Sequence, residues 1–468
     1  MQHDYSSPLE EALAVANGGG FIVPCQGGDT LLATQSGFNT SVCSEGSCII
    51  ASNLHNSAEV LPNLIVQLAR LAHILGPANI LVSVYESGST DATRQWLDLL
   101  RGVLSALSVR HVITSKGSLI RRRDQDRIAF LASVRQAAVD QAAAACDSYR
   151  AAASGSSAGG AGTCTASRLV FVNDVFFNAA DVVRLLQYGG GAGGGGYDVA
   201  CGMDFEPILA DLPLARQRDA MSAHLQRTWG LAEATATWLS SWPLAFRYWK
   251  KAYRRAPSLL RALPLLFYDI WVARDLTGGR LYRAAPYAAH AATAKRLRAG
   301  LPVDMYCCWN GLVALAAEPL LPGRGASGAA SVRFRAGDVA AGECAASECS
   351  LLCDDLRRLG RGAAVMDPGV LVAYRRVAAE RLFADSEGAG RGGGRGGGGA
   401  DDYTGIELED GEGWGVELLA ELAAWRRQHV SADMPHTVEC CGLRPGSEGV
   451  DFEHGCARVA APHAGPAP

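Results

Sequence analysis

The stretch Asn79-Ile-Leu-Val-Ser-Val-Tyr-Glu-Ser-Gly-Ser-Thr-Asp-Ala-Thr-Arg94 decides the fold class of this chain. Its first half, residues 80–85, is apolar enough for a buried strand, and a polar turn containing Gly88 then leads into a helix near Asp91. Such a joint brings carboxylates and the backbone amides of a helix N-terminus to one edge of a sheet. We therefore expect a binding site for a nucleoside diphosphate at that edge.

Strands and helices alternate on both sides of this joint. Further strands are predicted at residues 47–53, 109–114, 168–172 and 198–203, and helices at residues 58–75, 91–107 and 124–141. Strands that are separated by helices imply parallel crossovers and a sheet covered on both faces. The sequence therefore predicts an α/β fold with a single, Rossmann-type, mostly parallel sheet flanked by helices.

Tracts dominated by Ala, Gly and Ser interrupt the pattern. They bury too little apolar surface to offset the entropy of ordering, so we expect flexible insertions at residues 142–167, 189–196 and 323–331. The expected organisation is a variable N-terminal segment, one large catalytic domain, a Gly/Arg-rich linker and a C-terminal tail, at residues 1–44, 45–380, 381–400 and 401–468.

Composition restricts the partners and the compartment. A formal net charge of -4 over 468 residues gives no sign of a nucleic-acid partner. The 14 Cys exceed what a cytosolic enzyme of this size usually carries, which favours a secretory lumen. Zinc is the alternative for Cys344, Cys349 and Cys353, but their spacing is wide and no His lies nearby, so disulfides or buried thiols are favoured.

Residues that follow the predicted strands are the candidates for binding the nucleoside diphosphate. After residues 80–85 these are Glu86, Ser87, Gly88, Ser89 and Asp91. The Glu86 carboxylate suits the N1 and N2 donors of guanine or the hydroxyls of ribose. Asp91 binds in the same way or caps its helix. Arg127, on the following predicted helix, faces a phosphate or is a solvated surface charge.

Asp174, after the strand at residues 168–172, is the candidate metal ligand. The charge of a leaving diphosphate is neutralised by a hard cation, Mn²⁺ or Mg²⁺, held by a carboxylate, phosphate oxygens and waters. Asn173 adds a neutral carbonyl oxygen, so the pair holds one strong ligand and a weaker or metal-independent site stays open. The alternative is that Asn173 and Asp174 form an ordinary turn.

Several motifs occur together in an order that is typical of one family. They are Tyr85-Glu-Ser-Gly-Ser-Thr-Asp91, Phe171-Val-Asn-Asp-Val175, Cys201-Gly-Met-Asp-Phe205, Phe267-Tyr-Asp-Ile-Trp-Val-Ala-Arg-Asp275, Tyr306-Cys-Cys-Trp-Asn-Gly311 and Gly342-Glu-Cys-Ala-Ala-Ser-Glu-Cys349. From about residue 48 to residue 374 the chain resembles the fungal capsule-associated α-1,3-mannosyltransferase family, glycosyltransferase family 69.

The resemblance implies a GT-A-like fold, a GDP-mannose donor, a glycan acceptor and retention of the anomeric configuration. It also implies a type II Golgi membrane protein with a lumenal catalytic domain. No apolar run of about 18 residues, the length that crosses a bilayer, occurs in the sequence. The expected N-terminal anchor, through which the protein would associate with the membrane, is therefore not visible here.

The later motifs supply candidates for the acceptor and for catalysis. Trp309 and Asn310 offer an aromatic plane and an amide for sugar binding, and a buried core Trp is the alternative. Asp269 is a further acid on the acceptor side. Glu348 and Asp204 are the catalytic candidates, with Glu348 preferred, because a carboxylate orients an acceptor hydroxyl or stabilises an oxocarbenium-like centre.

Some interpretations stay open. Residues 227–283 interleave Trp with Lys and Arg, which suits a membrane surface, although packing of the Trp rings against the core is the favoured interpretation. Because the acid pair at Asn173 and Asp174 is incomplete, a catalytically silent module that binds nucleotide sugars or glycans is the alternative function. A cytosolic thiol or zinc protein is a third.

Overall fold

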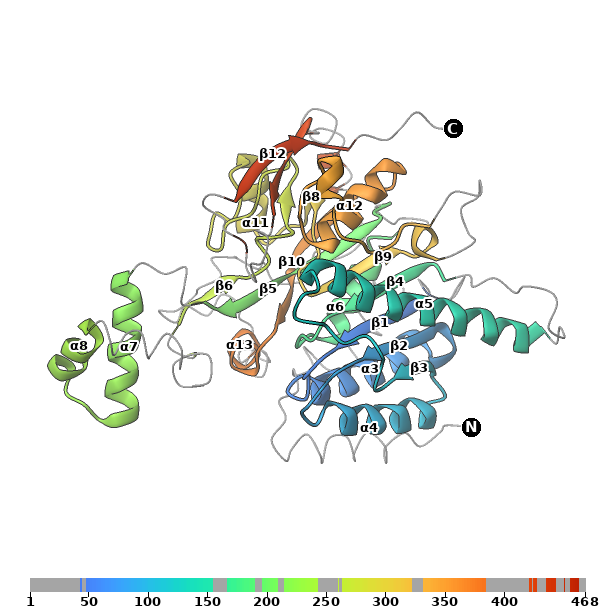
Figure 1. The fold of residues 1–468 in the computed structure, drawn as a ribbon, viewed down its shortest axis with the longest axis horizontal. Helices are drawn as coiled ribbons and strands as arrows, with labels where there is room; N and C mark the ends of the chain where they lie inside the picture. Colours follow the sequence, from blue (N-terminus) through green and yellow to red (C-terminus); the bar gives the residue numbers. More distant parts are fainter. Residues whose placement is uncertain are drawn as a thin grey trace.

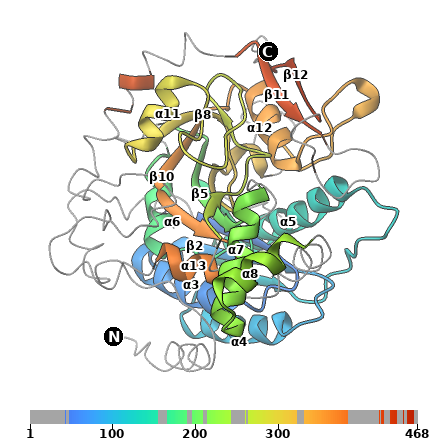
Figure 2. The same cartoon turned by 90° about the vertical axis from the view of Figure 1, so that its left-hand side faces the viewer.

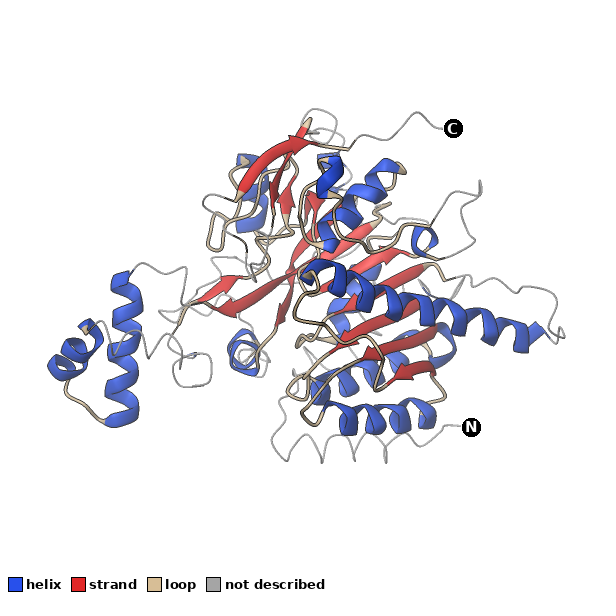
Figure 3. Cartoon of the chain, viewed as in Figure 1, coloured by secondary structure: helices blue, strands red, loops and turns tan. Residues whose placement is uncertain are grey.

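A computed structural model describes residues 43, 48–154, 166–189, 196–208, 214–242, 260, 263–321, 331–383, 421–422, 424–426, 435–442, 450 and 455–462. Within these residues, helices flank a 10-stranded mixed sheet, and a separate 2-stranded sheet lies near the C-terminal end (Figure 1; Figure 3). The predicted linker beyond residue 383, most of the N-terminal segment and most of the insertions lie outside the described residues.

The first half of the chain alternates strands and helices as predicted. Its elements are β1 (Cys48–Leu54), α3 (Leu61–Leu75), η2 (Pro77–Asn79), β2 (Ile80–Glu86), α4 (Thr93–Ala106), β3 (Arg110–Thr114), α5 (Arg127–Ser154), β4 (Arg168–Val172), α6 (Ala179–Leu186) and β5 (Val199–Pro207). Every residue of β2 and β4 is buried, as a sheet covered on both faces requires.

One predicted insertion is helical where it begins. Helix α5 continues to Ser154, so residues 142–154 form its last turns and are not a flexible tract. The Ala-rich composition explains the difference, because Ala has the highest helix propensity of all residues. Ala142, Ala143 and Cys146 are buried against the sheet, which anchors this extension.

The second half adds elements that the sequence pattern did not predict in detail. These are α7 (Leu214–Trp229), α8 (Glu233–Ser241), β6 (Leu265–Phe267), β7 (Arg274–Asp275), α11 (Ala291–Arg298), β8 (Val303–Cys307), β9 (Leu312–Ala316), η4 (Glu318–Leu320), η5 (Val339–Ala341), α12 (Glu348–Arg358), β10 (Ala364–Ala373), α13 (Arg376–Leu382), β11 (Thr437–Cys441) and β12 (Cys456–Ala460).

The order of the strands places the site. It runs β3-β2-β1-β4-β9-β5-β10-β8-β7, with β6 paired to β5. Strand β1 pairs in parallel with β2 and β4, and β9 lies antiparallel between β4 and β5, so β5 and its parallel partner β10 again run with β4. The predicted α/β class with a mostly parallel sheet is confirmed. The carboxyl ends of β1, β2 and β4 are neighbours at one edge.

Disulfides account for most of the cysteines in the described residues. The pairs are Cys43–Cys48, Cys201–Cys308, Cys307–Cys353, Cys344–Cys440 and Cys441–Cys456, and Cys146 is also disulfide-bonded. Cys349 is a buried free thiol. Because Cys344 and Cys353 are bonded, the zinc interpretation is wrong and the favoured one, disulfides or buried thiols, is confirmed. Among the described helices, none is long and apolar enough to cross a membrane.

Helices α7 and α8 form a hairpin that stands apart from the sheet (Figure 1; Figure 2). Trp229, Trp238 and Trp242 on this hairpin are 68%, 54% and 47% exposed, so the predicted packing of these rings against the core is wrong. The rings of Trp238 and Trp242 instead contact each other, with centroids 4.6 Å apart. Other members of the Trp-basic stretch lie outside the described residues: Trp249, Lys250, Lys251, Arg254, Arg255 and Arg261.

Candidate active site

A pocket of about 390 Å³ opens at the carboxyl ends of β1 and β2. The predicted donor residues Ser87, Gly88 and Arg127 line it. The remaining lining comes from β1 and β2, from the loop after β3 and from the first turns of α5: Asn53, Leu54, His55, Tyr85, Leu119, Ile120, Arg121, Phe130, Leu131 and Val134. A pocket at the carboxyl edge with apolar walls and two arginines, Arg121 and Arg127, suits a nucleotide.

Glu86 holds the turn that borders this pocket. Its buried carboxylate accepts the backbone amides of Ser89 and Lys116, both at 2.8 Å, and pairs with Arg94 at 3.4 Å. Burial opposes ionisation, but these amides and the arginine outweigh it and lower the pKa of Glu86. The structure therefore gives Glu86 a role in shaping the loop, and the predicted contact with guanine or ribose stays a prediction.

The loops after β1 and β2 are tied to each other. The Ser89 hydroxyl accepts the amide of Asn56 at 3.0 Å, and the Asn56 side-chain oxygen accepts the amide of Thr90 at 2.8 Å. Between them, Gly88 has a φ of +73° and lies beside the His55 ring, so a side chain at this position would be strained. The result is a fixed rim along one side of the pocket.

Asp91 lies one residue before Ala92, the N-cap of α4, and its carboxylate binds the first amide of that helix. Its carboxylate accepts the amide of Thr93 at 3.0 Å, the Thr93 hydroxyl at 2.6 Å and the amide of Ala58 at 3.1 Å. Burial opposes these contacts, yet the hydrogen bonds prevail and lower the pKa of Asp91. Of the two interpretations open from sequence, this geometry favours the cap over direct binding of the nucleoside.

Asp174 presents its carboxylate to solvent at the end of β4. Desolvation by the surrounding protein raises its pKa to about 6, and the positive charge of Arg135 and the His55 ring oppose the rise. In the described part of the chain, no other residue donates a hydrogen bond to this carboxylate. An accessible carboxylate whose charge is incompletely compensated fits a divalent cation.

Asn173 is already engaged by neighbours. Its side-chain oxygen accepts the indole N–H of Trp309 at 3.3 Å, and its side-chain nitrogen donates to the Tyr374 hydroxyl at 3.3 Å. The predicted use of this oxygen as a metal ligand therefore competes with Trp309. In this geometry Asn173 positions the residues beside Asp174.

Arg135, which sequence reasoning missed, links the site to the core. It lies on α5 after Arg127 and packs its guanidinium over the Trp309 ring at 5.0 Å. It pairs with Glu348 and donates to the Cys349 sulfur. Burial opposes its charge, but Cys349 and Glu348 outweigh burial and raise the pKa of Arg135. Its inward orientation is invisible in a sequence, because helical arginines usually face solvent.

The predicted acceptor platform is not open to a ligand. Trp309 is 2% exposed and packs against Phe171 and Phe334, with ring centroids 5.3 and 5.6 Å away. Asn310 is fully buried and donates to the carbonyl of Gly202 at 2.7 Å. The alternative of a buried core Trp therefore describes Trp309, and the two residues do not contact an acceptor in this geometry.

Asp204 and Asp269 form a pair of acids. One Asp204 oxygen accepts the amide of Asp269 at 3.0 Å, while its other oxygen, Oδ2, is buried with no hydrogen-bond partner in the part of the chain that the structure describes. Burial raises the pKa of both, and for Asp204 the neighbouring Asp269 charge adds to the rise. Two neighbouring buried carboxyl groups cannot both ionise easily, because their negative charges repel each other.

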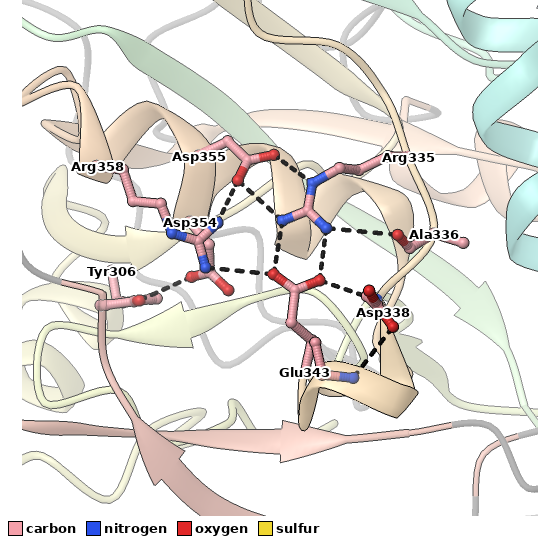
Figure 4. A network of polar contacts seen from close by, with 9 residues as sticks. Tyr306, Arg335, Ala336, Asp338, Glu343, Asp354, Asp355 and Arg358 are labelled. Carbon is pink, nitrogen blue, oxygen red and sulfur yellow. Dashed lines mark hydrogen bonds and ion pairs between the residues drawn. The ribbon is translucent and has the colours of Figure 1, made fainter.

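Glu348 makes a buried ion pair, and Glu343 makes a partly exposed one. Glu348 is 1% exposed, with its carboxylate held by Arg135 and by the Ser347 hydroxyl at 3.2 Å, so it does not face an acceptor as predicted. The Glu343 carboxylate accepts hydrogen bonds from the two terminal guanidinium nitrogens of Arg335, at 2.6 and 3.0 Å. Arg335 also donates to Asp355, which extends the network (Figure 4). These hydrogen bonds lower the pKa of Glu343 to about 2.

Comparison with known proteins agrees with the motifs. Residues 47–355 match the family model described as Cryptococcal mannosyltransferase 1. The chain is 25% identical, over 365 residues, to "Alpha-1,3-mannosyltransferase CMT1" of Cryptococcus neoformans var. neoformans serotype D (strain JEC21 / ATCC MYA-565). That alignment covers 73% of this chain and 60% of the relative, so the chain spans less than two thirds of the relative's length.

A solved structure is similar at a lower level. It is "Mannosyltransferase PcManGT from Pyrobaculum calidifontis in complex with GDP-Man and Mn2+", with 10% identity and a TM-score of 0.29 over 92% of this chain and 83% of that chain. This similarity is too low to transfer any property. The family match, by contrast, extends from β1 into α12 and includes the strands that carry the site. The chain belongs to the family described as Cryptococcal mannosyltransferase 1.

Proposed function

We propose that this protein is a glycosyltransferase that moves mannose from GDP-mannose to a hydroxyl of a glycan acceptor, with retention of the anomeric configuration. The observation that carries the proposal is a convergence at one sheet edge. The pocket, lined by Ser87, Gly88 and Arg127, opens at the end of β2, and the exposed Asp174 follows β4. Strands β2 and β4 are the two neighbours of β1. The names of the family and of its relative support mannosyl transfer.

The donor would lie along this edge. The nucleoside fills the pocket, whose walls include the Phe130 and Leu131 side chains, and Arg127 faces the diphosphate. Glu86 acts indirectly, because it fixes the turn that carries Ser87 and Gly88. The rim would therefore need little rearrangement when the donor binds.

Asp174 would hold the divalent cation, Mn²⁺ or Mg²⁺, together with diphosphate oxygens and waters. When bound, such a cation neutralises the charge that develops on the leaving diphosphate. Among the described residues, no other residue donates a hydrogen bond to the Asp174 carboxylate, and the neighbouring Asn173 is fixed by Trp309 and Tyr374.

The protein would work in the Golgi lumen, attached to the membrane through an N-terminal anchor. Support for the lumen comes from the disulfides that join distant parts of the chain, such as Cys201–Cys308 and Cys344–Cys440, because such bonds persist in oxidising compartments. Expression of the tagged protein in fungal cells, with protease protection of sealed microsomes, tests this placement. A protein that is digested without detergent would contradict it.

A turnover assay tests the proposed activity. The full chain is incubated with GDP-mannose, Mn²⁺ and α-1,3-mannobiose, and released GDP and the sugar product are measured. We expect manganese-dependent GDP release that Asp174→Asn abolishes, while the matched control Asp98→Asn, an exposed aspartate on α4, retains it. Donor binding without turnover in the wild type would instead favour the silent binding module, and no response to any nucleotide sugar would exclude both.

A further inference from the structure

An exposed aromatic ring lies beside the acid pair. Tyr268 directly follows the buried strand β6, yet its side chain is 47% exposed. Its ring packs against Tyr374 with centroids 5.1 Å apart, so protein supports one part of the ring and solvent reaches another. Aromatic rings of this kind bind the apolar C–H face of a pyranose, because the contact removes apolar ring surface from water.

Hydrogen bonds fix the main chain that carries this ring, and the Tyr374 ring supports the side chain. The amide of Tyr268 donates to the carbonyl of Asp204 at 2.9 Å, and its carbonyl accepts the amide of Ile270 at 2.9 Å and a guanidinium nitrogen of Arg283 at 3.0 Å. A ring that is held before a ligand arrives loses less entropy on binding. Tyr268 therefore has the rigidity that a recognition platform needs.

Two acids lie close to Tyr268 through its backbone contacts. Asp204 is fully buried and its Oδ1 accepts the amide of Asp269, while among the described residues its Oδ2 has no hydrogen-bond partner. Asp269 is half-buried, and its oxygens accept one backbone amide each, from Val272 at 3.2 Å and Asn310 at 3.3 Å. Because a carboxylate oxygen can accept more than one hydrogen bond, the half-buried Asp269 can also accept a ligand hydroxyl.

The ring contacts of Tyr268 connect it to the proposed cation site. The Tyr374 ring that packs against Tyr268 carries the hydroxyl that accepts the side-chain nitrogen of Asn173 at 3.3 Å, and Asn173 directly precedes Asp174. Burial raises the pKa of the Tyr268 phenol, and the carboxylates of Asp204 and Asp269 raise it further. Tyr268 therefore lies on the side of the site where an acceptor would approach the donor.

We propose that Tyr268 and Asp269 form the subsite for the acceptor sugar, with the buried Asp204 holding the Asp269 amide in place. The ring stacks on a pyranose face, and the Asp269 carboxylate accepts hydrogen bonds from its hydroxyls. This inference rests on the proposed function and moves the acceptor role from the buried Trp309 and Asn310 to Tyr268.

Binding of α-1,3-mannobiose, followed by saturation-transfer difference NMR on the full chain with GDP and Mn²⁺, tests the subsite without requiring turnover. Loss of the ring in Tyr268→Ala should weaken the dissociation constant roughly tenfold, whereas Tyr268→Trp, which keeps an aromatic plane, should stay within about twofold. Asp269→Asn should also weaken binding. Tyr149→Ala is the matched control, because Tyr149 is 39% exposed and lies near Arg110 on the edge strand β3, whereas Tyr268 follows β6, which pairs with β5.

The melting temperature of each variant shows whether it is folded. Mannobiose binding that is unchanged in folded Tyr268→Ala, or equally weakened in Tyr149→Ala, would overturn the subsite, as would a wild-type protein that binds no mannobiose. Binding that depends on Tyr268 in a protein that neither binds nor turns over GDP-mannose would support the subsite and refute the proposed function. The two failures are therefore distinguishable.

Discussion

Replacement of Arg135 by Met tests whether Glu348 is its buried counter-ion or a catalytic group. The Glu348 side chain is 1% exposed and that of Arg135 is 11% exposed, so the substitution leaves a carboxylate unpaired inside the protein. Breaking a buried pair by removing one partner costs about 3–5 kcal/mol. Loss of the guanidinium from the Trp309 ring adds about 1 kcal/mol.

The second substitution, Glu348→Gln, removes the charge that Arg135 balances. In the double variant neither charge remains, so we expect it to recover about 2–3 kcal/mol of the loss seen in Arg135→Met. Urea unfolding followed by tryptophan fluorescence gives the free energy of unfolding for the wild type, both single variants and the double variant.

The coupling free energy between the two substitutions tests whether Arg135 and Glu348 stabilise each other as an ion pair. Losses that add within about 0.5 kcal/mol would show that the two side chains do not stabilise each other, and would refute the ion-pair account. A Glu348→Gln variant that folds like the wild type and yet loses turnover would return Glu348 to the catalytic role expected from sequence.

Three further predictions concern the frame of the site. Hydrogen bonds from Arg335 lower the pKa of Glu343 to about 2, so its contribution to stability is present above its ordinary pKa of 4.5 and is lost as pH falls toward 2. As the pH falls, the free energy of unfolding should therefore decrease by about 1–2 kcal/mol more in the wild type than in Glu343→Gln, after allowance for partial exposure of the pair. Thermal unfolding measured across this pH range tests this, and an equal decrease in both proteins would contradict it. The double substitution of Cys201 and Cys308 by Ser, which opens a loop of sequence separation 107, should cost about 2–5 kcal/mol in chemical unfolding, and an unchanged midpoint would show that this bond is not formed. Gly88→Ala, at a φ of +73°, should cost about 1 kcal/mol and weaken GDP binding in calorimetry, whereas unaltered affinity would show that the turn does not shape the pocket.

The sheet edge was predictable because its signal is local. Apolar strands followed by polar residues mark β1, β2 and β4 in the sequence, and parallel pairing then brings the residues after them together. The same logic placed Ser87 and Gly88 at the pocket and left Asp174 open to solvent. Local patterns could not show that the Glu86 carboxylate already accepts backbone amides, or that the Asp91 carboxylate accepts the amide of Thr93.

The second half depends on contacts between distant residues. Strand β9 inserts antiparallel between β4 and β5, which draws the preceding Trp309 and Asn310 into the core. A motif of an aromatic residue and an amide looks the same in a sequence whether it is buried or exposed. The inward direction of Arg135 and the exposure of Tyr268 likewise follow from packing across the sheet and carry no periodic signal.

Calorimetric titration of GDP with and without Mn²⁺, into the wild type and into Asp174→Asn, is the most direct test of the cation site at the end of β4. We expect Mn²⁺ to tighten GDP binding roughly tenfold or more in the wild type and to have no effect in Asp174→Asn, whose unliganded melting temperature should match the wild type. Equal enhancement by Mn²⁺ in both proteins would contradict the account, because the cation would then be held elsewhere.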